Sequence, residues 1–339
     1  MLRVLKLVVC ATTLAASALP AKDLNGAGAT FPNPIYQKWF SEFRKAHPDV
    51  EINYQSVGSG AGIRQLTEGT VDFGASDGPM TDQQITEFKN KRHTDVLHVP
   101  TVLGAVVPAY NLPGISADLK FSGELLADIF LGKIKKWNDA AIANVNPNVK
   151  LPNTDIIIVH RSDGSGTTYI FTDYLCKISS EWQQKVGKNT SVNWPTGLGQ
   201  KGNEGVAGEI RQMQGAIGYI ELIYALQNKI AFGSVQNSTG KFIKGSLESV
   251  TAAAASAKNM PIDFRVSITN APGKNAYPIS SFTWLLIPAK WSDGAKRRVV
   301  VDFLSWMLNT GEGMTSDLNY APLPKTVADK VRAEIKAIH

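Results

Sequence analysis

The strongest constraint on the fold is a repeated order of strand-like and helix-like segments along most of the chain. Residues 32–47 carry large apolar side chains at helical spacing, with Pro32 suited to the first turn and Pro48 stopping the helix. Residues 50–54 alternate apolar and polar side chains, as a half-buried strand does. The same criteria predict strands at 71–75 and 155–159 and helices at 62–68, 167–178 and 251–257.

This strand-then-helix order predicts an α/β fold, with mostly parallel sheets flanked by helices on both faces. The chain has 339 residues, which is too long for one ordinary core, so we expect two lobes. Residues 100–113 and the Pro/Gly-rich stretch 270–280 are candidate crossings between the lobes. Two crossings would join the lobes through a hinge. Sheets of this kind bind ligands at the carboxyl ends of their strands.

The first 21 residues have the features of an export signal. Arg3 and Lys6 precede an uncharged apolar run at 7–19, with candidate cleavage sites at 16–18 or 19–21. The alternative is a membrane anchor, but the run is shorter than the ~20 residues that span a bilayer. A cleaved signal peptide at 1–21 predicts a secreted mature chain.

The composition narrows the class of protein. Hydrophobic residues make up 43% of the chain and charged residues 19%, which is typical of a globular protein and not of a disordered one. The net charge of +6 falls to +4 without Arg3 and Lys6. Basic residues form no stripe with interleaved aromatics, so a nucleic-acid function has little support. The one dense basic cluster, 133–136, is interpreted as a solvated face. Cys10 lies in the signal, which leaves Cys176 without an intramolecular disulfide partner.

Four short segments place glycine, serine or threonine between a strand and the start of a helix. A helix N-terminus has unpaired backbone N–H groups and a partial positive charge, glycine allows an anion to approach closely, and hydroxyls add donors. One such segment is usually only a turn or a cap. Several in one chain, one of them with an arginine, favour an oxyanion-binding site. The segments are 26–32, 58–62, 76–79 and 161–167.

Arg161 is the only strong cation in these segments. A guanidinium can donate to two oxygens of a tetrahedral oxyanion at once, and Asp163 could orient it. The alternative is a surface ion pair, worth ~0–1 kcal/mol. The position of Arg161 after a buried strand and before a Gly-Ser-Gly run favours the binding role.

Asp77 is unexpected in this group because a carboxylate repels an anion. An ionised carboxylate can only accept hydrogen bonds, so it suits a ligand that keeps a proton. Hydrogen phosphate has such a proton at neutral pH and sulfate does not, so Asp77 would select phosphate by rejecting sulfate. The alternative is a turn aspartate that caps the helix near Thr81, although Thr81 and Gln84 already form a capping box.

With these segments, the chain resembles the periplasmic phosphate-binding protein of the bacterial high-affinity phosphate ABC transporter, the PstS family. The resemblance runs from about Asp23 to near the C-terminus. It implies a two-lobed α/β fold of the periplasmic-binding-protein type (type II-like), with a hinged cleft and both chain ends in one lobe. The predicted bounds are 22–101 with 276–339 for the first lobe and 102–275 for the second. The motifs that carry the resemblance are 26–32, 70–77, 131–137, 161–167 and 215–219.

The resemblance also implies which residues bind the phosphate. Thr30 and Ser59 would each donate a hydroxyl and a backbone N–H, and Phe31 would donate a backbone N–H. Asp77 would accept the ligand proton and Arg161 would supply the guanidinium. Asp163 matches the aspartate that pairs with the arginine. The eight implied phosphate-binding residues are Thr30, Phe31, Ser59, Asp77, Arg161, Ser165, Gly166 and Thr167.

The resemblance further implies a non-catalytic, monomeric protein of the periplasm, with no cofactor and no metal. It would deliver inorganic phosphate to the membrane permease subunits of an ABC transporter, and residues 133–137 are a candidate docking segment. A phosphate-handling enzyme is one rival, but the five histidines lack metal-ligand spacing and residues 197–205 lack the ending of a phosphate-binding loop. The other rival is a carrier of molybdate, sulfate or a phosphorylated sugar.

Overall fold

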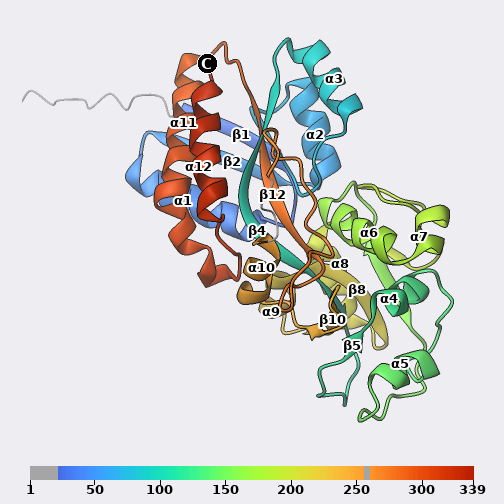
Figure 1. Cartoon of the computed structure of the whole chain (residues 1–339). Helices are drawn as coiled ribbons and strands as arrows, with labels where there is room; N and C mark the ends of the chain where they lie inside the picture. Colours follow the sequence, from blue (N-terminus) through green and yellow to red (C-terminus); the bar gives the residue numbers. More distant parts are fainter. Residues whose placement is uncertain (1–21, 256–259) are drawn as a thin grey trace, which may run out of the picture.

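The protein has an α/β fold of two lobes, which lie at the upper left and lower right of Figure 1. The computed structural model describes residues 22–255 and 260–339. The predicted signal at 1–21 and the end of the predicted helix at 251–257 lie outside the described residues; that helix, α10, spans Leu247–Ala254 as described.

The two lobes share one large sheet, and a small sheet lies in the second lobe. The strands are β1 Lys22–Gly28, β2 Val50–Ser56, β3 Phe73–Ser76, β4 Val96–Tyr110, β5 Lys120–Phe121, β6 Ile157–Arg161, β7 Leu198–Gln200, β8 Ala216–Glu221, β9 Ala231–Phe232, β10 Ser234–Gln236, β11 Phe242–Ile243 and β12 Ser280–Pro288. The other helices are α1 Asn33–Ala46, α2 Ser59–Glu68, α3 Asp82–Arg92, α4 Gly123–Phe130, α5 Ala140–Val145, α6 Gly166–Ile178, α7 Ser180–Lys185, α8 Gly202–Gln212, α9 Leu222–Gln227, α11 Gly294–Asn309 and α12 Lys325–Glu334, with short 3₁₀ turns at Gly311–Met314, Ser316–Leu318 and Ile335–Ala337.

The large sheet is mixed and not mostly parallel as the sequence predicts. Its order is β2-β1-β3-β12-β4-β8-β6-β7, and β9 pairs with β4. The β1–β2, β1–β3, β6–β7 and β6–β8 pairs are parallel, whereas the central pairs that β12 and β4 make are antiparallel. Every antiparallel pair of the large sheet therefore involves β4 or β12, and the pairs among its other described strands are parallel.

Strand β4 joins the two lobes. Its residues 96–105 pair with β12, and its residues 106–110 pair with β8. Nearly the whole strand is buried, which agrees with its run of apolar residues. The predicted crossing at 100–113 is thus largely a continuous strand, because hydrogen bonds on both sides satisfy its backbone.

Two groups of helices cover the sheet in the first lobe. Helices α1, α11 and α12 lie on one side, and α2 and α3 lie on the other (Figure 1). The helix predicted at 32–47 is confirmed as α1. Its apolar face packs on α11: the rings of Phe40 and Phe303 lie 5.1 Å apart, and those of Phe43 and Trp306 5.6 Å. Burial of such aromatic faces holds α1 against α11.

Most other predicted elements are present with shifted ends. Helix α2 begins at Ser59, three residues before the predicted start, and ends before Gly69, whose φ of 75° is left-handed and favours glycine. The strands predicted at 71–75 and 155–159 occur as Phe73–Ser76 and Ile157–Arg161. The shift of β6 places Arg161 as the last residue of a strand.

In the basic segment 133–137, the lysines lie on the surface and Trp137 lies in the core. Lys133 pairs with Glu181 and, at 3.1 Å, with Asp128, while Lys136 lies 2.9 Å from Asp155. Trp137 is buried and donates its indole N–H to a backbone carbonyl at 2.9 Å. Lys133 and Lys136 therefore lie on the surface, where they pair with acids, and Trp137 is a core residue.

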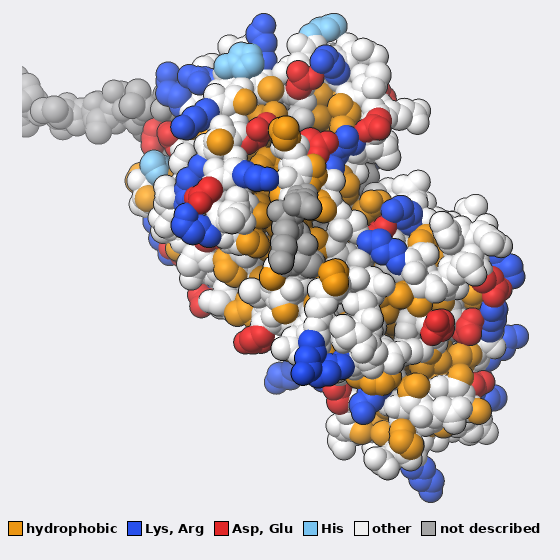
Figure 2. All heavy atoms as spheres, viewed as in Figure 1, with side chains coloured by type: hydrophobic (Ala, Val, Ile, Leu, Met, Phe, Trp, Pro, Cys, Tyr) orange, Lys and Arg blue, Asp and Glu red, His pale blue; other side chains and the backbone are white. Residues whose placement is uncertain are grey.

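Charges of both signs are interspersed on the visible face of the molecule (Figure 2). In the described parts of the chain, no helix is both long and apolar enough to cross a membrane.

Candidate functional site

The four glycine-rich segments meet where the two lobes touch. Thr30 follows β1, Asp77 follows β3, and Arg161 ends β6, so all three lie at the carboxyl ends of strands. Ser59 and Gly166 begin α2 and α6. We call the eight predicted phosphate-binding residues the interlobe cluster, and all of them are buried.

Direct contacts between the lobes connect the cluster. The hydroxyl oxygen of Ser59 accepts hydrogen bonds from the N–H of Gly166 at 3.0 Å and from the N–H of Asp77 at 3.3 Å. The N–H of Gly60 donates to the carbonyl of Gly164 at 2.8 Å. Since both oxygen lone pairs of Ser59 face N–H donors, its own proton must point to another acceptor.

Arg161 is buried and is not a surface ion pair. Its side chain is 1% exposed, and its Nε and Nη2 donate to the two oxygens of Asp163 at 2.7 and 2.5 Å. Its Nη1 makes a long hydrogen bond to Thr167 Oγ1 at 3.4 Å. Burial alone would raise the pKa of Asp163, but the hydrogen bonds and charge of Arg161, together with the N–H of Gly202, lower it. Asp163 therefore holds two of the three guanidinium nitrogens of Arg161.

Asp77 is a buried carboxyl and not a helix cap. It is 1% exposed, and Thr283 donates its hydroxyl to Oδ1 at 2.8 Å. The helix cap is formed by Thr81 and Gln84, as the sequence predicts. Burial raises the pKa of Asp77 to about 7, although the hydrogen bond from Thr283 and the charge of Arg161 act in the opposite direction. Near neutral pH the protonated and ionised forms of the Asp77 carboxyl are therefore close to equally populated.

Three tyrosines fix the backbone that precedes α1. The hydroxyls of Tyr54, Tyr224 and Tyr320 donate to the three consecutive carbonyls of residues 29–31, at 2.7, 2.6 and 2.6 Å. These tyrosines come from β2, α9 and the segment before α12. With its carbonyls held in this way, the run keeps a fixed orientation of its N–H groups. No pattern in the sequence indicates this role, because the three tyrosines are far apart along the chain.

Four backbone N–H groups of the cluster donate to no acceptor in residues 22–255 and 260–339. They belong to Thr30, Phe31, Ser59 and Thr167, which are all at most 2% exposed. Helix starts leave such donors free, and a buried unpaired donor costs ~1–3 kcal/mol. An anion held among these groups would satisfy them, whereas a cation would not.

Asn203 is a further residue of the site that the sequence analysis does not identify. It is fully buried near the start of α8, and its amide Nδ2 donates to Thr30 Oγ1 at 2.8 Å and to Thr167 Oγ1 at 3.0 Å. A signal existed: residues 197–205 are a fifth glycine-rich run before a helix. Ser165 is the N-cap of α6, and its hydroxyl oxygen accepts from the N–H of Thr168 at 3.0 Å.

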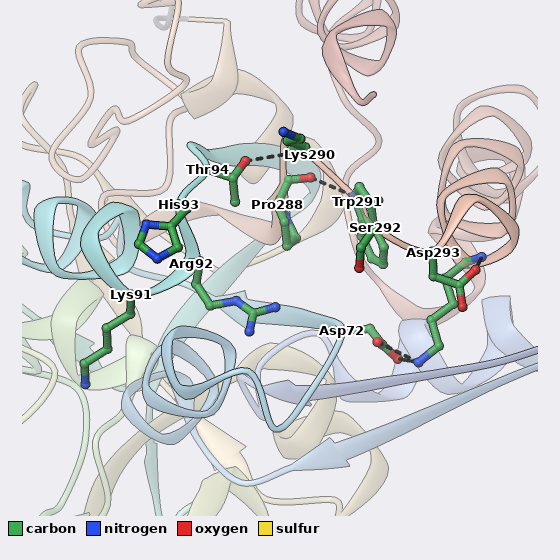
Figure 3. A pocket seen from close by; sticks show the side chains of 11 residues that line it. Asp72, Lys91, Arg92, His93, Thr94, Pro288, Lys290, Trp291, Ser292 and Asp293 are labelled. Atoms are coloured by element: carbon green, nitrogen blue, oxygen red, sulfur yellow. Dashed lines mark hydrogen bonds and ion pairs between the residues drawn. The ribbon is translucent and has the colours of Figure 1, made fainter.

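A surface cavity of about 500 Å³ lies elsewhere on the first lobe, between the end of α3 and the start of α11 (Figure 3). Both acids and bases line it, and Lys296 already pairs with Asp72 at 2.8 Å. None of the interlobe cluster lines this cavity. Among the described residues, no group of three or more His, Cys, Asp or Glu side chains could hold a metal ion.

The comparisons with known proteins agree with this fold. Residues 13–310 match the model of the PBP superfamily domain. The chain is 46% identical to the phosphate-binding protein PstS of Xylella fastidiosa, over 91% of this chain and 84% of that protein. It is 45% identical to the protein of the same name from Haemophilus influenzae, over 93% of both chains. The solved structure of a high affinity periplasmic phosphate-binding protein, PfluDING, bound with phosphate, superposes with a TM-score of 0.75 at 22% identity, over 92% of this chain and 93% of that one.

The two-lobed fold and the buried cluster of donors between the lobes define a binding protein of the PBP superfamily. Within that class, the chain belongs to the PstS family of phosphate-binding proteins.

Proposed function

We propose that this protein is an extracytoplasmic solute-binding protein that binds inorganic phosphate in the interlobe cluster and delivers it to an ABC importer. The observation that carries the proposal is the set of four unpaired, buried backbone N–H groups beside one guanidinium and one carboxyl of raised pKa. Its relatives are named phosphate-binding proteins.

Dipoles supply most of the attraction in this site. The charges of Arg161 and Asp163 offset each other, so a phosphate would be held by N–H and hydroxyl donors aimed from two lobes. Hydrogen bonds to a charged group contribute roughly 1.5–3 kcal/mol each. Micromolar affinity corresponds to ~8 kcal/mol, so a handful of these bonds suffices even after the cost of closing the cleft.

Asp77 would choose among anions. As a carboxylate it accepts hydrogen bonds only, so it pairs with the proton that phosphate retains and opposes sulfate, which has none. The hydroxyl of Thr283 fixes the Asp77 carboxyl at 2.8 Å, which supports a role that depends on position.

Closing of the two lobes around the ligand would couple binding to transport. Phosphate would contact both lobes only when they meet, so binding favours the closed state that a membrane permease could recognise. We place the lobes at 22–101 with 276–339 and at 102–275. The change of partner along β4, from β12 to β8 between residues 105 and 106, lies within a few residues of this boundary.

The remaining features follow from the family. We propose that the protein is exported to the periplasm by a signal at 1–21, acts as a monomer, is not an enzyme, and uses neither a cofactor nor a metal. The proposed partners are inorganic phosphate and the permease subunits of a phosphate ABC transporter.

Calorimetry on the purified, exhaustively dialysed protein tests the proposed function. Titration with inorganic phosphate, sulfate, molybdate and glucose 6-phosphate should give one site of micromolar or tighter affinity for phosphate and weak or absent binding of the other anions. Sulfate binding as tight as phosphate binding would remove the selective role of Asp77. Metal-dependent turnover of a chromogenic phosphate ester would instead favour an enzyme.

A further inference from the structure

Asn203 lies between the two threonine hydroxyls of the interlobe cluster. It is fully buried, and its position in the sequence is 173 residues from Thr30 and 36 residues from Thr167. The orientation of its amide is fixed, because Oδ1 accepts the backbone N–H of Glu221 at 2.9 Å and a backbone N–H can only donate. The Nδ2 group therefore faces the two threonines.

The contacts of Asn203 determine the direction of both hydroxyl protons. Thr30 Oγ1 accepts from Nδ2 of Asn203 at 2.8 Å and from its backbone N–H at 3.2 Å. Thr167 Oγ1 accepts from Nδ2 at 3.0 Å and from Nη1 of Arg161 at 3.4 Å. A hydroxyl has two lone pairs and one proton. With both lone pairs of each oxygen facing N–H donors, each proton must be donated to another group.

We propose that Asn203 is a positioning residue that makes the hydroxyls of Thr30 and Thr167 donors toward the bound anion. This inference rests on the proposed function, because the anion is the phosphate that the cluster would bind. Asn203 acts through the two threonines and does not need to touch the phosphate. It also links the lobes, since Thr30 follows β1 in the first lobe and Asn203 is the second residue of α8 in the second. Closure of the lobes therefore determines which way the two threonine hydroxyls donate, as well as the shape of the site.

Aspartate has nearly the shape of asparagine, but its carboxylate accepts hydrogen bonds where the Asn203 amide nitrogen donates them. A carboxylate only accepts hydrogen bonds, so both hydroxyl protons would turn toward it and both oxygens would present lone pairs to the anion. At lower pH the carboxyl gains one proton and one donor returns. Alanine removes the donor and adds no charge. If Asn203 only filled space, the aspartate and alanine variants would not differ in how their phosphate affinity depends on pH.

The test is calorimetric titration of inorganic phosphate into the full-length protein and its variants between pH 5.5 and 8.5. Dividing each variant's Kd by that of the unaltered protein at the same pH cancels the titration of phosphate itself. For Asn203→Asp we expect a ratio of about 100 or more at pH 8.5, which falls at least about fivefold by pH 5.5. For Asn203→Ala we expect a ratio of about 10 to 100 that does not change with pH.

Asn146→Asp is the matched control. Asn146 is also buried, and its amide makes two hydrogen bonds with the backbone of Lys120 in β5, at 2.8 and 3.0 Å, and one with the carbonyl of Ile142 in α5, at 3.0 Å. Asn146 is not part of the interlobe cluster, so the Kd ratio of Asn146→Asp should stay near one. The melting temperature of this variant measures how much a buried Asn→Asp change lowers stability in general.

Two outcomes would overturn the inference alone. One is an Asn203→Asp ratio below about three at pH 8.5, and the other is an identical ratio for the aspartate and alanine variants at every pH. If the aspartate variant does not fold, a ratio near one for Asn203→Ala overturns the inference and a ratio of about 10 or more supports it. Failure of the unaltered protein to bind phosphate would overturn the proposed function, and the inference with it.

Discussion

The carboxylate of Asp163 receives two parallel hydrogen bonds from the guanidinium of Arg161, at 2.7 and 2.5 Å, although only one residue separates them in the chain. The pair turns one edge of the guanidinium toward Asp163 and leaves Nη1 on the side of Thr167, at the start of α6. The strand end at Arg161 and the turn that follows it create this geometry. Asp163 thus fixes the direction of a buried cation.

Removal of that cation should abolish tight binding. Arg161→Ala should weaken phosphate binding by about 2–5 kcal/mol, the range for loss of one partner in a buried charged hydrogen bond. Calorimetry measures the effect, and Arg298→Ala, an exposed arginine on α11, is the control that should leave Kd unchanged. An unaltered dissociation constant in Arg161→Ala would exclude Arg161 from the site.

The selection against sulfate should depend on Asp77. Asp77→Asn removes the negative charge, so the difference between the Kd values for phosphate and sulfate should narrow. The change is expected to be modest, because the amide oxygen still accepts a hydrogen bond. Competition titrations with both anions measure the difference. If the variant excludes sulfate as fully as the unaltered protein does, another group selects the anion.

Asp77 should also make stability depend on pH in the absence of phosphate. Burial raises its pKa to about 7, above the ~3.9 of an unfolded chain, so the folded protein holds this proton more tightly. The free energy of unfolding should therefore fall as the pH rises from about 4 to 7, and this contribution should then stay constant. Melting temperatures at pH 5 and pH 8 should differ less in Asp77→Asn than in the unaltered protein. An equal difference in both proteins would contradict the raised pKa.

Gly166 should be essential for closure. A Cβ atom at this position would lie 2.4 Å from an oxygen of Asp77 and 2.5 Å from the hydroxyl of Ser59. Gly166→Ala should therefore hold the lobes apart and weaken phosphate binding by about 100-fold or more, ~3 kcal/mol. Gly208→Ala is the matched control, since nothing lies within 4 Å of its added Cβ and alanine favours a helix by ~0.5–1 kcal/mol. Tight binding by Gly166→Ala would mean that the lobes do not close as described.

The buried carboxylate of Asp173 should contribute to stability and not to binding. Burial alone would raise its pKa, but hydrogen bonds from Lys188, Ser267 and Thr269 lower it to about 2. Because the folded-state pKa is below that of the unfolded chain, the stabilisation is present above about pH 4 and is lost as the pH falls toward 2.

Asp173→Ala should accordingly reduce the free energy of unfolding at pH 7 by about 2–4 kcal/mol, since charged hydrogen bonds are lost and their partners remain. Asp155→Ala is the control. Its pair with Lys136 is exposed at both ends and should contribute less than about 1 kcal/mol. Urea denaturation measures the free energy of unfolding of both variants. An equal decrease in the two would contradict a larger contribution from the buried Asp173.

Much of the site could be predicted from the sequence because its parts are local. A glycine-rich turn before a helix start is a property of a few consecutive residues, so the segments around Thr30, Ser59, Asp77 and Arg161 could be found one at a time. Their meeting in one cluster depended on the order of the strands. Parallel strands place their carboxyl ends at one edge, which made the convergence expected within each lobe.

The mixed order of the central sheet could not be found in this way. The residues of β4 are apolar along nearly all of its 15 positions. Such a run contains no pattern that predicts which strand it pairs with, or whether the pair is parallel or antiparallel. The same holds for Thr283, whose hydroxyl reaches Asp77 across 206 residues of sequence.

The sequence by itself therefore determined the helix starts, the donors they expose and the one arginine among them, because each depends on neighbours along the chain. The tertiary structure alone decided that Asn203 lies between the two threonines, that three tyrosines hold the carbonyls of residues 29–31, and that Asp77 is buried. These contacts join residues from separate elements. The direction of a hydrogen bond and the cost of a buried charge are set by surroundings that exist only once the lobes have packed together.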